Sequence, residues 1–555
     1  SRVSKPPTEW WKATSSSHPN TQHEAHITQE TFLIANDVPT SYTDAVSDAK
    51  VDFWAPGIEK EHNALLENKA FVLVERQQGM NVIPCRYVFR VKGDQPKVRL
   101  VAKGFRQVHG VDYFETYAPV VSLAAVRCFL ALVAHFDLEC DQMDVVTAFL
   151  NGELDEDIYM EVPAGFKDPN RPHLVCKLQK ALYGLKQAPK QWYAKINNFL
   201  VHNLNFTSSP YEPCLYTLND KGSMTLIVLY VDDILVAGSS RTTVDRIKDE
   251  FKSRYKMKDL GEASEFLSIS INRNRSKRTL HITQTCYTDK ILERFNMVDA
   301  NPTCTPMEVN SPHLESSDLD PEQPAHDVPY RQAIGCLMYL MIGTRPDIGY
   351  AVGKLSQYCE KPTKSNWSSV KRVLRYLKGT RNIGITFRGN SNVQPVGYCD
   401  SDWAGCRETR KSTEGMVFLL AGGAVHWRSK KQSIVATSTC EAEYIAAYSA
   451  TKEAIWLSRL FASMLHQASS TPITVRIDNH GTVQMAHNVS INARNKHIDI
   501  RYHFVREAVG TKLVVLEHCS HTEQVADTLT KPLPRIKFVE CREKMGLQEL
   551  SATES

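Results

Sequence analysis

Two adjacent aspartates, Asp232 and Asp233, interrupt the most apolar stretch of the chain. They lie between two apolar segments, residues 226–230 and 234–237, that favour the two arms of a β-hairpin. Neighbouring carboxylates repel each other and are costly to bury, and a bound divalent cation removes that cost. Oxygen ligands suit Mg²⁺, which combines few carboxylates with substrate phosphates. The pair therefore predicts a magnesium site, with a solvent-facing turn as the less favoured alternative.

Phosphoryl transfer with two metal ions needs a further carboxylate from another strand. Asp144 offers one, well before Asp232 in the chain, at a predicted junction between a strand and a helix. Alone, Asp144 would be interpreted as a plain helix cap. Beside the aspartate pair, it is predicted to be the third metal ligand.

A second set of acidic residues lies in the last third of the chain. Its members belong to four short segments: CDSD (399–402), EAE (441–443), IDN (477–479) and EQVADTL (523–529). The first and third segments end predicted strands, and the second and fourth begin predicted helices. Carboxylates that converge from strand ends and helices can bind two metal ions, although each one alone is equally a cap or an exposed charge.

The elements that must position these residues alternate between strands and helices. Residues 1–50 are predicted to be a polar leader, and residues 301–329, with six prolines, a linker. Residues 86–106 contain seven Lys or Arg and one Asp, which suits phosphate binding or else a solvated strand face. We predict strands at 70–75, 87–91, 97–102, 396–399, 413–420, 424–428 and 473–477, and helices at 123–136, 182–200, 330–379 and 439–465.

The composition is that of a globular protein with several domains. The 555 residues are 42% apolar and 23% charged, which excludes a mainly disordered or fibrous chain. A net charge of +4 permits nucleic-acid binding through a local surface. The best apolar run is split by the aspartate pair and is too short to span a bilayer. Scattered cysteines without a CxxC pair are expected to be buried thiols in a reducing compartment.

Five motifs together resemble the reverse transcriptase of copia-type LTR retrotransposons: RLVAKGFRQ (99–107), QMDVVTAFLNGEL (142–154), LYGLKQAPKQWY (182–193), YVDDILVAG (230–238) and KHIDIRYHFVR (496–506). The resemblance covers about residues 40–540. It implies an α+β and α/β multidomain fold, with a right-hand polymerase of fingers, palm and thumb, a connection region and a ribonuclease H-like α/β domain. The implied divisions are a leader or integrase junction (1–50), fingers and palm (51–285), thumb, linker and connection (286–391), ribonuclease H (392–540) and a tail (541–555).

The resemblance assigns Asp144, Asp232 and Asp233 to the metal-binding and catalytic triad of the polymerase. Phe149 matches the aromatic residue that blocks a 2′-hydroxyl and so selects dNTPs; its alternative is an ordinary core Phe. Residues 265–271 resemble the hairpin that positions the primer end.

Three further residues are implied to bind the incoming nucleotide. Gln187 matches a glutamine that touches the nucleotide. Lys92 and Arg99 match residues of the fingers that grip its triphosphate. This assignment agrees with the phosphate-binding character of the basic segment that contains them.

The same resemblance implies the metal-binding and catalytic residues of the nuclease, which are Asp400, Glu443, Asp478 and Asp527. Asp402 and Glu441 are near neighbours that rank lower. His521 is either a histidine that assists product release or a plain surface residue. His497 and His503 belong to a family signature and receive no mechanistic role.

The implied function is that of an RNA- and DNA-directed DNA polymerase with a ribonuclease H. The implied cofactor is Mg²⁺, two ions per active site, with Mn²⁺ as a substitute. The partners are an RNA template, a DNA or tRNA primer, the RNA/DNA hybrid and dNTPs, with the integrase and capsid protein of the same element, in a cytoplasmic virus-like particle and without a membrane. A homodimer is left open. The rival interpretation, a non-catalytic nucleic-acid-binding remnant, has no reason to retain all seven carboxylates.

Overall fold

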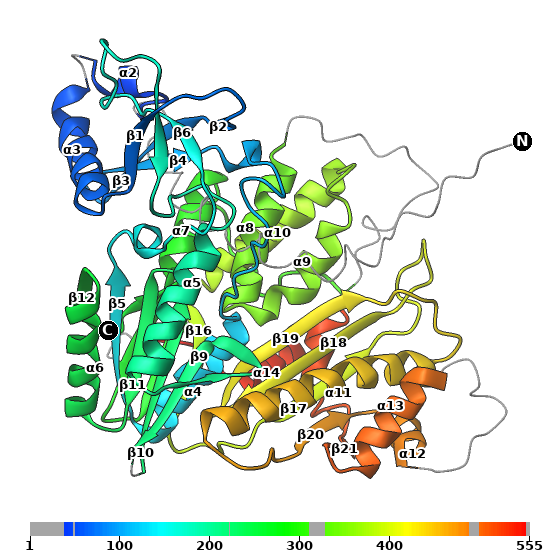
Figure 1. Cartoon of the computed structure of the whole chain (residues 1–555). Helices are drawn as coiled ribbons and strands as arrows, with labels where there is room; N and C mark the ends of the chain where they lie inside the picture. Colours follow the sequence, from blue (N-terminus) through cyan, green and yellow to red (C-terminus); the bar gives the residue numbers. More distant parts are fainter. Residues whose placement is uncertain (1–37, 48–49, 221, 310–327, 488–498, 551–555) are drawn as a thin grey trace, which may run out of the picture.

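The computed structural model describes residues 38–47, 50–220, 222–309, 328–487 and 499–550. Over these residues the chain forms five β-sheets with helices packed around and between them, so the architecture is mixed α/β (Figure 1). All 14 cysteines fall within this part of the chain and are free thiols. No helix in it combines the length and the apolar character needed to cross a membrane.

The first part of the chain forms two small sheets beside helices α2 (Tyr42–Ala45) and α3 (Val51–Glu67). Trp54 of α3 packs edge-on against Phe89, with 5.4 Å between the ring centroids, and so covers one face of the two-stranded sheet formed by residues 85–102. One sheet has the order β1 (Phe71–Glu75), β7 (Leu174–Leu178), β6 (Tyr159–Glu161) and β2 (Val82–Ile83), and the other pairs β3 (Cys85–Lys92) with β4 (Gln95–Ala102).

The largest sheet has six strands, and the aspartate pair lies at the turn between two central ones. Helix α6 (Arg241–Arg254) packs against it, and Lys248 of α6 forms a buried ion pair with Asp141 of the sheet. Three further helical elements belong to this part of the chain: η4 (Ala148–Asn151), α5 (Ala188–Asn198) and the π-helix η5 (Phe199–Asn203), which contacts β8. The strand order is β12 (Met257–Glu262), β5 (Glu139–Val145), β11 (Asp233–Gly238), β10 (Ser223–Tyr230), β9 (Glu212–Asp220) and β8 (Thr207–Ser209).

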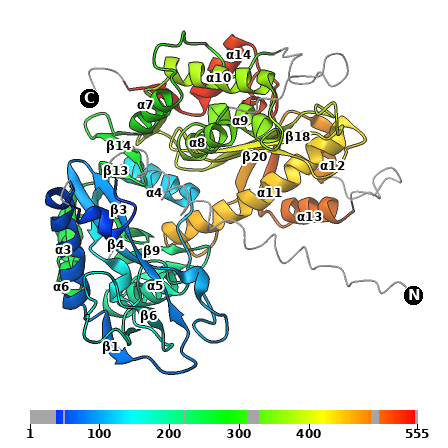
Figure 2. The same cartoon turned by 90° about the horizontal axis from the view of Figure 1, so that it is seen from above.

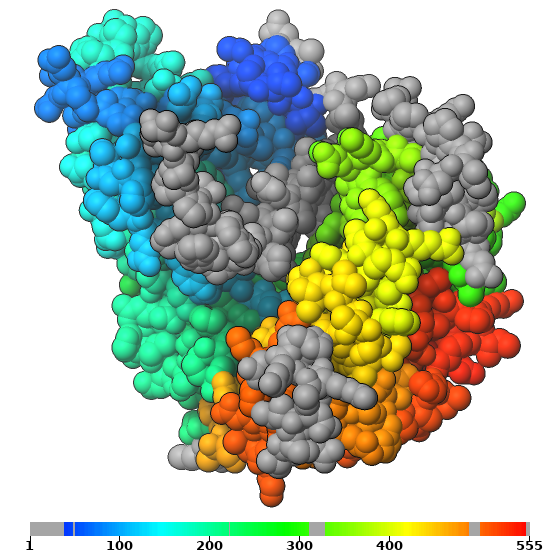
Figure 3. All heavy atoms as spheres, turned by 90° about the vertical axis from the view of Figure 1, so that its right-hand side faces the viewer, coloured from blue at the N-terminus to red at the C-terminus, as the bar shows by residue number. Residues whose placement is uncertain are grey.

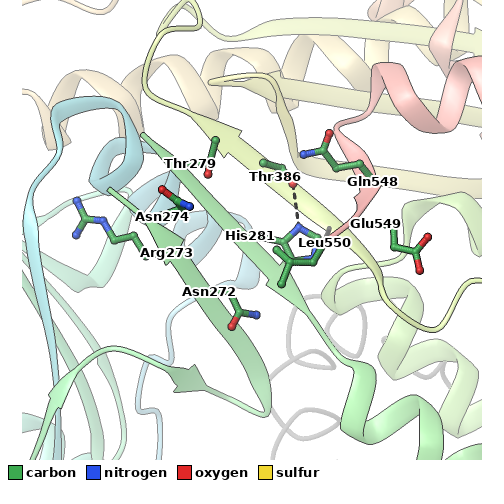
Figure 4. A pocket seen from close by; sticks show the side chains of 9 residues that line it. All are labelled: Asn272, Arg273, Asn274, Thr279, His281, Thr386, Gln548, Glu549 and Leu550. Atoms are coloured by element: carbon green, nitrogen blue, oxygen red, sulfur yellow. Dashed lines mark hydrogen bonds between the residues drawn. The ribbon is translucent and has the colours of Figure 1, made fainter. Parts of the chain in front are cut away.

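Another sheet collects strands from three distant parts of the chain. Its order is β13 (Glu265–Phe266), β14 (Ile269–Asn274), β15 (Thr279–Thr283), β16 (Ile383–Arg388) and β22 (Leu547–Glu549). His281 Nδ1 and Thr386 Oγ1 are 2.9 Å apart and hydrogen-bonded, in a small polar pocket that Gln548 and Glu549 also line (Figure 4). The sheet thus combines strands from three of the predicted divisions of the chain, since β22 lies after residue 540. The divisions at residues 285, 391 and 540 stay a prediction.

The segment predicted as helical over residues 330–379 is three helices with two interruptions. Pro346 and Pro362 stand at these interruptions, because proline cannot donate the hydrogen bond that continues a helix. The Thr363 hydroxyl then accepts a hydrogen bond from the Asn366 amide and caps the last of the three. The elements between β15 and β16 are α7 (Thr285–Arg294), α8 (Tyr330–Gly343), η7 (Pro346–Ile348), α9 (Gly349–Ser356) and α10 (Lys364–Gly379).

The C-terminal sheet combines parallel and antiparallel pairs. Its order is β19 (Gly423–Lys431), β18 (Thr413–Leu420), β17 (Val396–Ser401), β20 (Ile473–Ile477) and β21 (Val514–His518), and the last three strands are parallel. The carboxyl ends of β17 and β20 therefore meet at one edge of the sheet. The long helix α11 packs across these strands. The helices of this part are α11 (Thr439–Met464), α12 (His480–His487), α13 (Asp499–Gly510), η9 (Val525–Leu529) and α14 (Arg535–Lys544).

Helix α4 (Leu123–Phe136) joins the six-stranded sheet to the C-terminal sheet, since it contacts both β10 and β19 (Figure 2). Its Arg127 is 4% exposed, and the guanidinium donates to the carbonyls of Val425, Ile342 and Gly343 at 2.7–2.9 Å. The same group lies 3.9 Å above the Trp427 ring. The buried guanidinium of α4 thus connects α4 with α8 and β19. In Figure 3, cyan and teal residues of the first half of the chain lie on the left and yellow and red residues of its later part lie toward the right.

The predicted elements agree best with the structure where periodicity is strong. The helix at residues 123–136 and the strands at 413–420 and 473–477 have the predicted bounds. The helix predicted over residues 182–200 begins only at Ala188. Gly184 adopts φ +91°, and a Cβ there would lie 2.1 Å from the Ala102 carbonyl oxygen, so this stretch is a tight turn against a neighbouring strand.

Candidate active sites

Asp144 and Asp233 are register partners on the antiparallel strands β5 and β11, and Asp232 occupies the turn beside them. We call these three residues the hairpin cluster. Burial, together with the charges of Asp232 and Asp144, raises the pKa of Asp233 to about 7, although Lys92 and Lys97 oppose the shift. The fold therefore concentrates negative charge that a divalent cation would neutralise, and the oxygen donors fit such an ion.

A buried tryptophan holds the turn that carries the aspartates. Val231 has φ +55°, a left-handed backbone conformation that is rare for a β-branched residue. The indole nitrogen of Trp192 donates a 2.6 Å hydrogen bond to the Val231 carbonyl, and Trp192 is 2% exposed. The buried tryptophan of α5 thus stabilises the strained backbone beside Asp232.

Two basic side chains border the hairpin cluster. The Arg99 Nη2 lies 4.0 Å from Asp232 Oδ2, and the Lys258 Nζ of β12 lies 3.4 Å from Asp144 Oδ2. Lys92 ends β3 at the exposed tip of the β3–β4 ribbon and is close enough to lower the pKa of Asp233. The structure thus places Arg99 beside the hairpin cluster, together with Lys258, which the sequence did not indicate. The triphosphate contacts of Lys92 and Arg99 stay predictions.

An aromatic pair lies under the guanidinium of Arg99. The carbon of that group is 4.3 Å from the centroid of the Tyr183 ring, and Tyr183 packs edge-on against Phe149 at 4.7 Å. Burial raises the pKa of the Tyr183 hydroxyl, as do the charges of Asp232 and Asp144. Phe149 is 5% exposed and therefore belongs to the core. Its contact with Tyr183 connects it to the residues around the hairpin cluster.

Gln187 is buried and hydrogen-bonded within the protein. The residue is 1% exposed, and its amide nitrogen donates to the Asp112 carbonyl at 2.7 Å and to Glu156 Oε2 at 3.2 Å. Its oxygen accepts a 2.9 Å hydrogen bond from Gln107. Because its polar atoms are bonded within the protein, a nucleotide contact would require breaking these bonds. In the same motif, it is the Tyr183 side chain that contacts Arg99 next to the hairpin cluster. The sequence could have indicated Tyr183 only through its position as the second residue of LYGLKQAPKQWY.

The hairpin over residues 265–271 forms as β13 and β14, which pair antiparallel. Leu267 and Ser268 both have positive φ, so two left-handed residues make the turn. The Tyr339 hydroxyl of α8 donates a 2.5 Å hydrogen bond to the Leu267 carbonyl. The contact fixes the turn against the helical part of the chain.

Asp400, Glu443 and Asp478 converge in the C-terminal sheet, and we call them the C-terminal cluster. One ligand oxygen from each lies within 4.8 Å of the others, and within the described ranges no other set of three acidic, His or Cys side chains does so. Asp400 lies in β17, Glu443 in α11 and Asp478 directly after β20. The meeting of two parallel strand ends and one helix thus produces the site.

The C-terminal cluster fits a divalent cation. Glu443 is 6% exposed; its Oε1 accepts a 3.3 Å hydrogen bond from the Ser401 amide, and its Oε2 has no hydrogen-bond partner in the described part of the chain. Burial raises the pKa of Glu443, and the charges of Asp400 and Asp478 raise it further. A buried carboxylate oxygen without a partner, beside two more carboxylates, suits a hard cation with several oxygen ligands.

The lower-ranked neighbours have local structural partners. Glu441 Oε2 accepts hydrogen bonds from the Thr437 amide and hydroxyl at 2.7 and 2.6 Å, at the start of α11. Asp402 accepts a hydrogen bond from the Thr413 amide across the β17–β18 edge. Burial raises the pKa of Asp402 to about 6, against the effect of this hydrogen bond. These contacts favour Glu443 over Glu441 as the carboxylate that points into the cluster.

Asp527 stands apart from the C-terminal cluster. It lies in η9, and its Oδ1 is 2.7 Å from the Lys531 Nζ. His521 is 85% exposed, and its Nδ1 is 2.6 Å from Asp478 Oδ2, so it borders the site on the solvent side. His503 is exposed on α13, and His497 lies outside the described residues. The roles of Asp527 and His521 stay predictions, and His497 and His503 have no assigned role.

Comparison with known proteins gives one matching family model, described as reverse transcriptase (RNA-dependent DNA polymerase), over residues 68–309. The Pol polyprotein from transposon TNT 1-94 of Nicotiana tabacum is 39% identical over 547 residues, which are 96% of this chain and 41% of that protein. The Pol polyprotein from transposon RE2 of Arabidopsis thaliana is 36% identical, over 93% of this chain and 35% of the relative. The chain thus spans about two fifths of the length of these curated relatives or less.

A shorter relative is covered almost completely. A transposon Ty5-1 protein of Saccharomyces cerevisiae is 36% identical over 313 residues, which are 55% of this chain and 98% of that protein. The match to the family model includes the hairpin cluster, Lys92 and Arg99. The C-terminal cluster lies beyond residue 309 and is outside that match.

Proposed function

Because the chain belongs to the copia-type family of LTR-retrotransposon reverse transcriptases, we propose that it copies RNA, and then DNA, into DNA. We further propose that its C-terminal part is a ribonuclease H that cuts the RNA strand of the hybrid. The observation that carries the proposal is the presence of two separate carboxylate clusters, the hairpin cluster on the six-stranded sheet and the C-terminal cluster.

Each cluster would hold divalent cations, Mg²⁺ with Mn²⁺ as a substitute and two per site, by Asp144, Asp232 and Asp233 in one and by Asp400, Glu443, Asp478 and Asp527 in the other. When bound, these ions supply the charge neutralisation and the activated oxygen nucleophile that phosphoryl transfer requires. These carboxylates are carried by the strands β5, β11 and β17, the turns next to β11 and β20, the helix α11 and the short helix η9. The chain's other residues would bind and orient the nucleic acids.

In the polymerase site, Lys92 and Arg99 would bind the triphosphate of the dNTP. The Arg guanidinium can contact two phosphate oxygens at once, and the Lys ammonium supplies a point charge. Tyr183 orients the guanidinium of Arg99 by stacking beneath it. Phe149, which packs on Tyr183, would exclude a 2′-hydroxyl and so select dNTPs. Gln187 would reach the nucleotide only if the hydrogen bonds of its polar atoms within the core were broken, and its contact stays a prediction.

We assign the fingers, palm and thumb of a right-hand polymerase to the N-terminal sheets, the six-stranded sheet and the helices α7–α10. The β13–β14 turn would position the primer end. In the nuclease, recognition of the hybrid would depend on its shape and its 2′-hydroxyls, and backbone contacts would make binding sensitive to salt.

The relatives' names describe Pol polyproteins, and the proposal extends to a similar origin for this chain. Its partners would then include the integrase and capsid protein of the same element, in a cytoplasmic virus-like particle. The template would be the element RNA, with a tRNA or DNA primer.

The test is a pair of assays on the full chain. One follows dTTP incorporation on poly(rA) primed with oligo(dT), and the other follows cleavage of a labelled RNA/DNA hybrid. We expect both activities with Mg²⁺ and neither with EDTA. Tight hybrid binding without either activity would instead support a non-catalytic nucleic-acid-binding protein.

A further inference from the structure

Lys531 lies inside the proposed nuclease site. Its Nζ is 2.7 Å from Asp527 Oδ1 and 3.5 Å from Asp400 Oδ2, so one ammonium bridges two of the four predicted metal ligands. The neighbouring Thr530 hydroxyl donates a hydrogen bond to the same Asp400 Oδ2. The side chain of Lys531 is 42% exposed, whereas that of Asp400 is 2% exposed. The ammonium therefore has one side toward a buried carboxylate and the other toward solvent.

Residues 529–531 lie close to the end of the sheet because a glycine faces them. Gly415 is the register partner of Asp400, and a Cβ at Gly415 would lie 2.8 Å from Leu529 Cβ and from Thr530 Cγ2. The absence of a side chain at this one position allows residues 529–531 to pack over the strand end. The position of Lys531 is thus set by the backbone around it as well as by its own flexible stem.

The four carboxylates divide into two halves that share Asp400. The C-terminal cluster of Asp400, Glu443 and Asp478 contains an unpartnered buried oxygen, Glu443 Oε2, and is ready for a cation. The other half, Asp400 with Asp527, already contains one in the form of Lys531.

We propose that Lys531 is an internal counter-ion that occupies the Asp400–Asp527 half of the nuclease site until a second divalent cation displaces it. This inference rests on the proposed nuclease function. The C-terminal cluster would accept a first ion without competition, whereas the ammonium of Lys531 would have to leave Asp400 and Asp527 before they could hold a second ion. Because Lys531 is partly exposed on a long stem, it can turn to solvent and remain charged. The two halves therefore fill in order, and Lys531 sets the concentration at which the second half fills.

The experiment counts Mn²⁺ bound to the full chain by electron paramagnetic resonance, in an Asp232→Asn, Asp233→Asn background that removes binding at the hairpin cluster. We expect one tighter and one weaker site. Lys531→Met should strengthen the weaker site by about tenfold or more, since a competing charge is lost, and should lower the melting temperature of the metal-free protein. Lys531→Arg keeps the charge and should behave like the parent. Lys258→Met, which removes the lysine beside Asp144, is the matched control and should leave both sites unchanged.

A second measurement needs no substitution at Lys531. Acetylation of Lys531 by an N-hydroxysuccinimide ester, followed by mass spectrometry, should be slow in the metal-free protein and faster at saturating Mn²⁺. Equal labelling with and without Mn²⁺, or an unchanged second site in Lys531→Met, overturns the counter-ion role alone. If neither the parent nor Lys531→Met binds Mn²⁺ at the C-terminal cluster, the proposed nuclease function fails and the inference fails with it.

Discussion

Asp144 and Asp233 stand opposite each other on neighbouring antiparallel strands, as register partners of β5 and β11. The strands place two carboxylates side by side at the end of the hairpin, where burial and the charges of Asp232 and Asp144 raise the pKa of Asp233 to about 7. A sheet that concentrates charge in this way gains from a bound cation. This relationship underlies the first prediction.

Asp232→Asn should abolish DNA synthesis and leave hybrid cleavage largely intact. The amide is a poorer ligand for a hard cation, and Asp232 belongs to the hairpin cluster alone. Both activities are measured on one preparation, so the cleavage assay serves as the folding control. DNA synthesis within about tenfold of the parent rate would contradict the assignment.

Phe149→Ala should admit ribonucleotides. Removal of the ring opens space beside Tyr183, where a 2′-hydroxyl would otherwise clash. The measurement is the ratio of kcat/KM for rNTP and dNTP in primer extension, and we expect it to rise. Phe149→Tyr keeps the ring and is the matched control. An unchanged ratio in the alanine variant would mean that Phe149 only packs in the core.

Tyr183→Ala and Gln187→Ala should separate nucleotide binding from stability. Loss of the ring under Arg99 should raise KM for dNTP by about tenfold, because the guanidinium loses its platform. Tyr183→Phe should retain most of the affinity.

Gln187→Ala should instead cost stability, by about 1–3 kcal/mol, because buried partners lose their hydrogen bonds. Steady-state kinetics and thermal melting are both recorded. A raised KM for Gln187→Ala, with normal melting, would restore Gln187 as a nucleotide contact.

Glu443→Gln should reduce hybrid cleavage on the order of 10²-fold or more, because one carboxylate ligand of the cluster is lost. DNA synthesis on a simple primer should persist. Glu441→Gln is the internal control and should have a much smaller effect, since Glu441 accepts hydrogen bonds from Thr437. An exchange of the two effects would assign Glu441 as the ligand.

Arg127→Met should loosen the connection between the six-stranded sheet and the C-terminal sheet. The carbonyls of Val425, Ile342 and Gly343 would lose their donor, at a cost of about 2–5 kcal/mol. Thermal melting and limited proteolysis provide the measurement. Arg171→Met removes an exposed arginine and should have no such effect. Equal melting of the two variants would show that Arg127 does not hold the parts together.

Several elements could be predicted because their signal is local. The helix of residues 123–136 has Val126, Phe129, Leu130 and Val133 at helical spacing and Ser122 as its N-cap, and it is buried on all sides. The hairpin around Asp232 and Asp233 follows from two apolar arms and an acidic turn. The late start of α5 was missed because Gly184 turns against Ala102, a contact that no pattern within the motif contains.

The sequence by itself determined the residue types and their order: seven carboxylates in two groups, a basic ribbon, and motifs specific enough to indicate the family. Only the tertiary structure decided which side chains share a site, because strand register and helix phase decide where each one points. In the folded chain, Gln187 is buried in the core, and the Tyr183 ring lies beneath the guanidinium of Arg99. The tertiary structure also placed Lys531 between Asp400 and Asp527, through a packing contact at Gly415 that lies more than a hundred residues before Asp527 and Lys531 in the chain.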